Sequence, residues 1–140
     1  MKILFTAQAT AVGGRNGRSE AADKSVSVDL SIPKEMGGPG KPGTTTPEHL
    51  FATGYAACFG SALDYVARGK KIDVAGATIT AKVGIGQRDG GGFGLAVELE
   101  AYLPGHAQAD AEALVAEAHA ICPYSNAIRG NVDVTLTTRV

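Results

Sequence analysis

The sequence predicts a single α+β domain over residues 1–140, with antiparallel sheets packed around one long apolar helix. Three observations support this class. The length of 140 residues suits one domain that buries a sizeable core. Segments with strand-type composition are separated by clusters of glycine. Two further segments carry apolar residues at helical spacing, so the expected order is strand, strand, helix, strand, strand, helix, strand.

The first part of the chain is predicted to form a β-hairpin. Residues 2–12 and 24–32 have strand-type composition, and the second segment alternates apolar and polar residues. The string GGRNGR between them is typical of a tight turn. Residues 33–45 hold three prolines and four glycines, a composition that excludes regular structure and predicts a surface loop.

A long helix is predicted over residues 48–68. Thr46 supplies a hydroxyl N-cap, Pro47 takes the first helical position, and Glu48 places an acid in the first turn. Gly69 is the stop signal. The helix is apolar or small on nearly every side, which is typical of a buried helix. Because so short a chain has little to cover it with, we expect a homodimer.

The second half of the chain is predicted to hold three strands and a helix. Residues 77–85 and 95–103 form two strands joined by a glycine-rich turn. Residues 108–122 form a helix that the following proline ends. A short turn or helical piece covers 126–130, and residues 131–139 alternate as a final strand.

Composition excludes several classes of function. The net charge of −1 leaves no positive footprint, so we expect no nucleic-acid partner. The apolar runs are far shorter than the ~20 residues of a membrane span, so we expect no membrane partner. The N-terminus turns polar too early for a signal peptide, and a cytoplasmic protein is expected. Two cysteines in a reducing compartment act as thiols, not as a disulfide framework.

The two cysteines are the first candidates for chemistry. Cys58 lies in the middle of the apolar helix, where it is either an inert buried thiol or a reactive one. A reactive thiolate needs a cation, yet Arg68 and Lys70 lie more than two turns away, so any partner comes from elsewhere in the chain. Cys122 begins the string CPYS, which resembles a glutaredoxin site but follows a helix near the C-terminus. A glutaredoxin is therefore rejected, and a thiol site remains open.

Other motifs carry no chemistry. In the loop 33–45, Lys41 is followed by proline, so the phosphate-loop spacing fails. The three histidines have no regular ligand spacing, and no metal site is expected. No G-x-S-x-G string supports a serine hydrolase. Taken alone, Arg15 is an ordinary loop residue and Glu48 an ordinary helix-dipole acid.

Five strings taken together resemble a known family. GGRNG, TPEHLFATGYAACF, VGIG with GGFGLAVELE, and AHAICPYSNAIRGNVDVTL occur in the order found in the organic hydroperoxide resistance (Ohr) proteins of the Ohr/OsmC family. The resemblance covers essentially the whole chain. The CPYSNA string and the RGN that follows favour the Ohr branch over the OsmC branch.

The resemblance implies an OsmC-like fold, an intertwined homodimer with two long helices packed centrally between sheets. It also implies a thiol-dependent peroxidase that reduces organic and fatty-acid hydroperoxides to alcohols. Cys58 falls on the peroxidatic cysteine and Cys122 on the resolving cysteine. Arg15 falls on the arginine that stabilises the thiolate, and Glu48 on the acid that holds this arginine. No bound cofactor is implied, and the reductant is an external dithiol, dihydrolipoamide on a lipoylated protein.

Two positions depart from the family pattern. Thr46 stands where asparagine is expected, and Ile128 where threonine is expected. Apolar walls that select alkyl hydroperoxides are expected from four side chains, namely Met36, Leu50, Phe51 and Phe93. Three alternative hypotheses about the function stay open: an OsmC-type peroxidase with a broader substrate range, a non-catalytic carrier of hydrophobic ligands, and a redox-sensing interaction protein.

Overall fold

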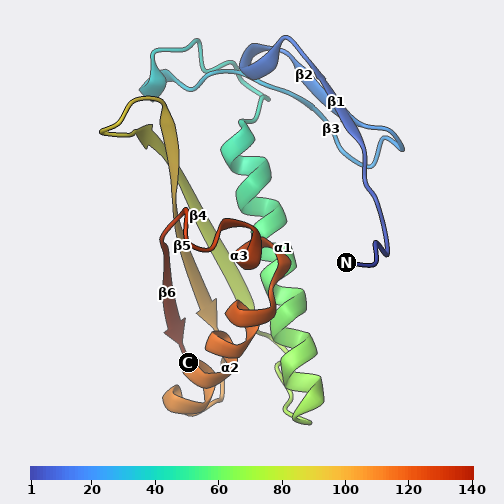
Figure 1. Ribbon diagram of the computed structural model, residues 1–140, viewed down its shortest axis with the longest axis vertical. Coiled ribbons are helices and arrows are strands. Elements are labelled where there is room, and N and C mark those ends of the chain that lie inside the picture. Colours follow the sequence, from blue (N-terminus) through green and yellow to red (C-terminus); the bar gives the residue numbers. More distant parts are fainter. The chain divides into compact units, whose positions relative to one another are not determined.

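The computed structural model describes residues 1–140, which form two compact units, residues 1–50 and residues 51–140. Its helices and strands confirm the α+β class (Figure 1). In chain order the elements are β1 (Ala9–Val12), the 3₁₀ helix η1 (Gly14–Asn16), β2 (Arg18–Ala21), β3 (Ser27–Asp29), the 3₁₀ helix η2 (Lys34–Met36), α1 (Pro47–Gly69), β4 (Thr78–Gln87), β5 (Phe93–Tyr102), α2 (Gln108–Ile121), α3 (Pro123–Ile128) and β6 (Val134–Arg139). The single domain over residues 1–140 stays a prediction.

The first unit contains a three-stranded antiparallel sheet in the order β1-β2-β3. The predicted hairpin of two long strands is wrong in detail, because residues 1–8 have no regular structure and β2 is the central strand. The β2 sequence RSEA has no apolar alternation, so its pattern gave no strand signal. Its Arg18 instead bonds across the sheet to Asp29 at 2.8 Å. The loop over 33–45 also holds η2, a single turn of 3₁₀ helix.

The second unit contains a three-stranded sheet in the order β4-β5-β6. β4 and β5 form the predicted antiparallel hairpin, with Val83 opposite Val97. β6 runs parallel to β5, so the expectation of purely antiparallel sheets is corrected here. The reason is the connection between them. Parallel neighbours need a crossover of a dozen or more residues, and α2 with α3 supplies it.

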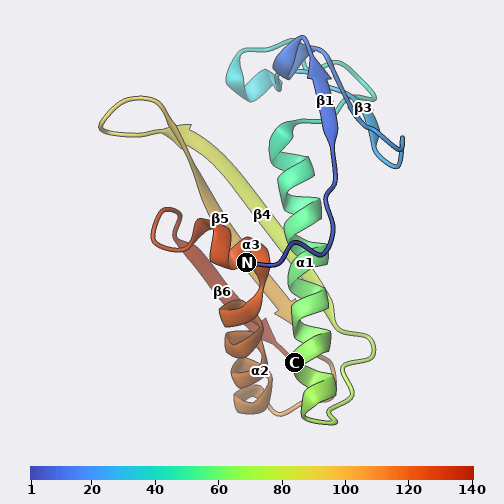
Figure 2. The same cartoon turned by 45° about the vertical axis from the view of Figure 1, so that its right-hand side comes forward.

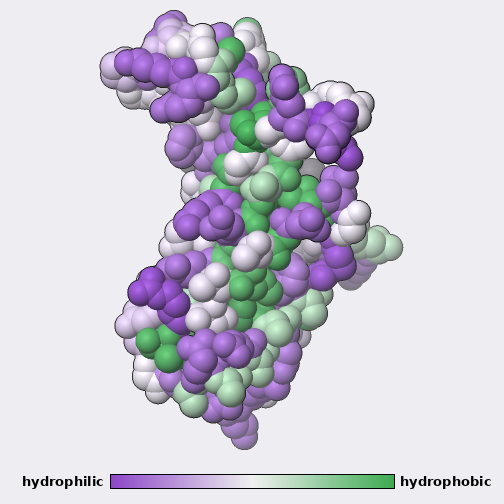
Figure 3. All heavy atoms as spheres, turned by 90° about the vertical axis from the view of Figure 1, so that its left-hand side faces the viewer, coloured by the Kyte–Doolittle hydropathy of each residue, from purple (hydrophilic) through white to green (hydrophobic).

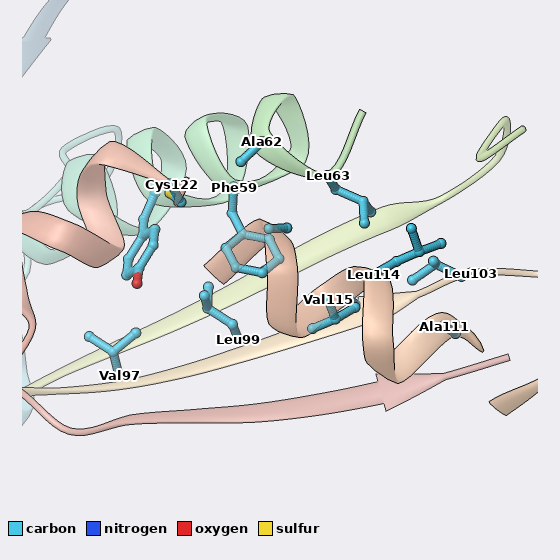
Figure 4. Close-up of a cluster of buried hydrophobic side chains, with 13 residues drawn as sticks. Phe59, Ala62, Leu63, Val97, Leu99, Leu103, Ala111, Leu114, Val115 and Cys122 are labelled. Atoms are coloured by element: carbon cyan, nitrogen blue, oxygen red, sulfur yellow. The ribbon is translucent and has the colours of Figure 1, made fainter. Parts of the chain in front are cut away.

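One face of this second sheet is covered by α2 and by the part of α1 that belongs to the second unit, which begins at residue 51 (Figure 2). Phe59 and Leu63 of α1 meet Leu99 of β5 and Val115 of α2 in one buried cluster (Figure 4). Burial of each such side chain contributes roughly 1.5–3 kcal/mol. The cluster also contains Cys122, whose side chain is fully buried. The apolar core therefore extends up to one of the two thiols.

The long helix is confirmed, since α1 spans Pro47–Gly69. Thr46 caps it as predicted, because its Oγ1 accepts the backbone N–H of His49 at 3.2 Å. Within one chain the helix is not buried on every side. An exposed ridge runs along the helix. It consists of Ala57, Ser61 and Tyr65, which follow one another at intervals of four residues. No helix of the chain is long and apolar enough to cross a membrane.

Candidate active site

The two thiols lie in contact although 64 residues separate them in the chain. The sulfur of Cys122 lies 3.7 Å from the sulfur of Cys58, and both cysteines are free. Cys58 projects from the middle of α1 and is partly exposed, whereas Cys122 is fully buried at the junction of α2 and α3. A disulfide needs a sulfur separation of about 2.0 Å, so a modest approach of the two side chains is enough to form one.

The environment of Cys58 works against its ionised form. Burial raises the pKa of the Cys58 thiol, and the neighbouring Cys122 raises it further. The backbone N–H of Tyr124, in the first turn of α3, donates to the sulfur and partly offsets this by lowering the pKa. The net direction is upward. A thiolate at neutral pH therefore needs an additional positive charge.

Three aromatic rings, two from α1 and one from α3, form a cluster in the first half of α1. The rings of Phe51, Tyr55 and Tyr124 lie with centroids 5.8–5.9 Å apart in each pairing. Gly54 makes room for them, because a Cβ at this position would lie 3.0 Å from the Tyr124 hydroxyl. Phe51, one of the four predicted wall residues, thus belongs to an aromatic cluster on the helix that carries Cys58.

The other three predicted wall residues lie elsewhere in the fold. Phe93 begins β5 and is largely exposed. Met36 in η2 and Leu50 belong to the first unit. Sequence reasoning missed Tyr55 and Tyr124. Helical spacing could have found Tyr55, which stands four residues after Phe51 on α1, whereas Tyr124 meets Phe51 only because α3 packs on α1.

Arg15 and Glu48 form a two-pronged ion pair in the first unit. Arg15 Nη1 donates to Glu48 Oε2 at 2.9 Å, and Nη2 donates to Oε1 at 2.6 Å. The Glu48 side chain is only 13% exposed, whereas that of Arg15 is 34% exposed, so the carboxylate is largely shielded from water and the guanidinium is not. The hydrogen bonds from Arg15 hold the pKa of Glu48 below its ordinary value, and those same bonds raise the pKa of Arg15. Glu48 therefore stays ionised and fixes the guanidinium in one orientation.

A tight backbone turn places Arg15. Arg15 lies in η1, which Gly13 enters with a φ of 75° and which Gly17 closes with its N–H on the carbonyl of Gly14. A Cβ on Gly17 would lie 1.7 Å from the carbonyl oxygen of Val12, and that atom is backbone and cannot turn aside. The turn that aims Arg15 thus depends on glycine at position 17.

Gly17→Ala is therefore expected to disrupt this turn. The backbone of β1 or η1 has to shift, at a cost on the order of 1–3 kcal/mol. Hydrogen exchange measured by mass spectrometry should show faster exchange over residues 9–21 and unchanged exchange over 93–102. Gly86→Ala is the matched control, because nothing lies within 4 Å of the Cβ it would add. Equal exchange over residues 9–21 in both variants would contradict the steric argument.

A buried hydroxyl near the thiols was not found from the sequence. Ser125 is fully buried, and its Oγ lies 2.8 Å from the Tyr55 hydroxyl and 2.9 Å from Nδ1 of His119. The sequence pattern indicated no role for His119 beyond that of a possible metal ligand. Spacing is the sequence signal that could have found these residues, because Tyr55, His119 and Ser125 each stand three positions from a cysteine. No group of three or more His, Cys, Asp or Glu side chains is arranged to hold a metal ion.

The structure brings the four predicted site residues together as two pairs, one in each unit: Arg15 with Glu48, and Cys58 with Cys122. A two-cysteine α+β protein is the class that this fold and site define. A model of the OsmC-like protein family matches residues 38–137. The chain belongs to this family, in its branch of organic hydroperoxide resistance proteins.

Individual relatives match nearly the whole chain. The organic hydroperoxide resistance protein of Xanthomonas axonopodis pv. citri is 53% identical over 137 residues, which cover 97% of this chain and 95% of that protein. A crystal structure of such a protein from Legionella pneumophila is 51% identical, with a TM-score of 0.94 over 99% of this chain and 100% of that one. OhrB of Bacillus subtilis is 41% identical, with a TM-score of 0.90 over 98% and 100% of the two chains.

Proposed function

We propose that this protein is a thiol-dependent peroxidase that reduces organic and fatty-acid hydroperoxides to alcohols. The observation that carries the proposal is the contact between two free thiols, 3.7 Å apart, of which only Cys58 is partly exposed. The more accessible sulfur meets the peroxide, and the buried sulfur meets the product of that reaction. Membership in a family of organic hydroperoxide resistance proteins supports the choice of oxidant.

The reaction proceeds in three steps. The Cys58 thiolate attacks the distal oxygen of the hydroperoxide, the O–O bond breaks, and the leaving alkoxide takes a proton to become the alcohol. Cys58 is left as a sulfenic acid. The Cys122 thiol attacks that sulfur, the S–S bond forms, and the hydroxyl leaves with the thiol proton as water. An external dithiol then reduces the disulfide by exchange and is itself oxidised to a cyclic disulfide.

Arg15 is proposed to stabilise the Cys58 thiolate and the developing alkoxide. Burial raises the pKa of the Cys58 thiol, so the thiolate needs a cation that α1 does not supply nearby. Glu48 uses two of the five N–H donors of Arg15, and three remain for the sulfur and the peroxide oxygens. Glu48 acts as a positioning residue that holds the guanidinium in one orientation.

We propose that the substrate is selected by the two rings of the aromatic cluster that reach the surface, those of Phe51 and Tyr124. Alkyl chains gain free energy when they leave water for such a surface, by about 25 cal/mol for each Å² buried, and hydrogen peroxide gains none. Organic hydroperoxides are therefore favoured over hydrogen peroxide.

A homodimer is proposed as the working form. The N-terminal segment exposes Ile3, Leu4 and Phe5, and the last two side chains are 90% and 82% exposed. Tyr65, on the exposed ridge of α1, is 71% exposed. Figure 3 shows hydrophobic side chains at the surface, flanked by hydrophilic ones. A second copy of the chain would cover such apolar surface.

The test is consumption of tert-butyl and linoleic-acid hydroperoxide with dihydrolipoamide as the reductant. Rapid turnover is expected with dihydrolipoamide and little with glutathione, because only a dithiol completes the exchange by ring closure. Cys58→Ser is the control for the thiol. A wild-type rate no higher than that of Cys58→Ser would refute the peroxidase and favour the carrier of hydrophobic ligands. Equal rates with glutathione would refute the lipoyl reductant alone.

A further inference from the structure

A chain of hydrogen bonds runs beside the two thiols and joins three helices through one atom. The Oγ of Ser125 on α3 bonds to the hydroxyl of Tyr55 on α1 at 2.8 Å and to Nδ1 of His119 on α2 at 2.9 Å. Ser125 and Tyr55 are both fully buried. We call these three residues, Tyr55, Ser125 and His119, the hydroxyl bridge.

Each member of the hydroxyl bridge stands three residues from one of the two cysteines in the chain. Tyr55 precedes Cys58 by three residues on α1. His119 precedes Cys122 by three, and Ser125 follows it by three. Residues three apart on a helix share a face, so Tyr55 lies on the face of α1 that carries Cys58. Cys122 is the residue between α2, which carries His119, and α3, which carries Ser125.

The members of the bridge are uncharged at neutral pH. Burial is the main reason why the pKa of His119 lies below its ordinary value, and the positive charge of Arg129 lowers it further. Burial likewise raises the pKa of the Tyr55 hydroxyl. The two bonds of the bridge run in one direction or the other according to the tautomer of His119, because Nδ1 of a neutral imidazole either accepts from Ser125 or donates to it. The bridge therefore brings no charge to the thiolate, and its action is positional.

The direction of the Cys122 side chain depends on how α2 and α3 pack around it. Cys122 lies between α2 and α3 with Pro123 behind it, and Cys58 is the one side chain that its sulfur contacts through a hydrogen bond. Rotation of α3 about this junction moves the sulfur of Cys122. Ser125 ties α3 to both α1 and α2 and so opposes that rotation, together with the bond from Arg129 at the end of α3 to the carbonyl of His119.

We infer that the hydroxyl bridge is a positioning device that holds Cys122 against Cys58 and thereby sets the rate of disulfide formation. This rests on the proposed peroxidase function. The step concerned is attack of the Cys122 thiol on the Cys58 sulfenic acid, in which the S–S bond forms, the S–O bond breaks and water leaves. The earlier attack of Cys58 on the hydroperoxide does not depend on the bridge.

The test separates these two steps in a single turnover. Purified reduced protein receives one equivalent of tert-butyl hydroperoxide, and quenched samples are analysed by intact mass with dimedone as a trap for sulfenic acid. In Ser125→Ala and Tyr55→Phe, formation of the alcohol should keep its wild-type rate, while disulfide formation slows by about tenfold or more. Dimedone-trapped Cys58 should accumulate in both variants.

Matched controls remove a hydroxyl outside the bridge. Ser61→Ala removes one that bonds to the carbonyl of Ala57, and Tyr102→Phe removes one on β5 whose residue is 40% exposed. Both controls should keep wild-type rates for the two steps. The double variant Tyr55→Phe/Ser125→Ala should lose no more than Ser125→Ala alone, because Tyr55 acts through Ser125.

A second readout needs no peroxide. The equilibrium between the Cys58–Cys122 disulfide and dithiothreitol should shift about tenfold toward the dithiol in Ser125→Ala, equivalent to ~30 mV. If the wild type consumes hydroperoxide but Ser125→Ala changes neither disulfide rate nor equilibrium, the inference is wrong and the peroxidase stands. If the wild type consumes none yet the equilibrium shifts, the peroxidase is wrong and the positioning role stands. Should Ser125→Ala fail to fold, Tyr55→Phe decides by the same readouts.

Discussion

Cys122→Ser is expected to stop the protein after one turnover, and Cys58→Ser is expected to abolish its reaction with hydroperoxide altogether. The difference follows from exposure and contact. Cys58 is the partly exposed sulfur, and Cys122 is fully buried, with its sulfur 3.7 Å from that of Cys58. With Cys122 absent, the sulfenic acid on Cys58 has no internal thiol to condense with. Excess hydroperoxide then oxidises it irreversibly to the sulfinic acid.

The measurement is consumption of hydroperoxide over many equivalents, followed by intact mass of the protein. Cys122→Ser should form about two equivalents of alcohol per chain, one on formation of the sulfenic acid and one on its oxidation, and then carry the mass of a sulfinic acid. Cys58→Ser should form none and keep its mass. Sustained turnover by Cys122→Ser at the wild-type rate would show that the dithiol reduces the sulfenic acid directly, and that Cys122 has no resolving role.

Arg15→Met is expected to lower the rate of the first step by about a hundredfold, the usual effect of removing one charged donor from a developing oxyanion. The reactive form of Cys58 is the thiolate, which exists above the thiol pKa. Burial already raises the pKa of Cys58, and loss of the cation proposed to face the thiolate should raise it further. Alkylation of Cys58 by iodoacetamide, followed against pH, should therefore shift to higher pH in the variant.

Two comparisons make the Arg15 result specific. Arg18→Met removes another arginine of the first unit, one that bonds to Asp29 on the exposed sheet, and should leave both the rate and the pH profile unchanged. Glu48→Gln keeps a side chain of the same shape but not the charge that fixes the guanidinium, and should fall between wild type and Arg15→Met. A wild-type pH profile in Arg15→Met would remove Arg15 from the mechanism.

Local patterns predicted most of the secondary structure. The caps and the apolar run placed the long helix within one residue at each end, and alternation placed β4 and β5 within two residues. The failures have physical reasons. β2 is held by its neighbours in the sheet and by exposed polar bonds, so no hydrophobic period marks it. The direction of β6 depends on the path of α2 and α3, and a strand pattern is the same in both directions.

The candidate site also has a part that the sequence predicts and a part that only the packing of the chain decides. The sequence by itself determined the two thiols, the helix that carries Cys58, and, through resemblance, the choice of Arg15 and Glu48. The tertiary structure alone decided which atoms meet: Arg15 with Glu48 across 33 residues, and Cys122 with Cys58 across 64. It alone revealed Ser125 as a buried link between three helices. The reason is that a hydrogen bond between distant residues requires a position in space, which local patterns do not encode but packing around a shared core does.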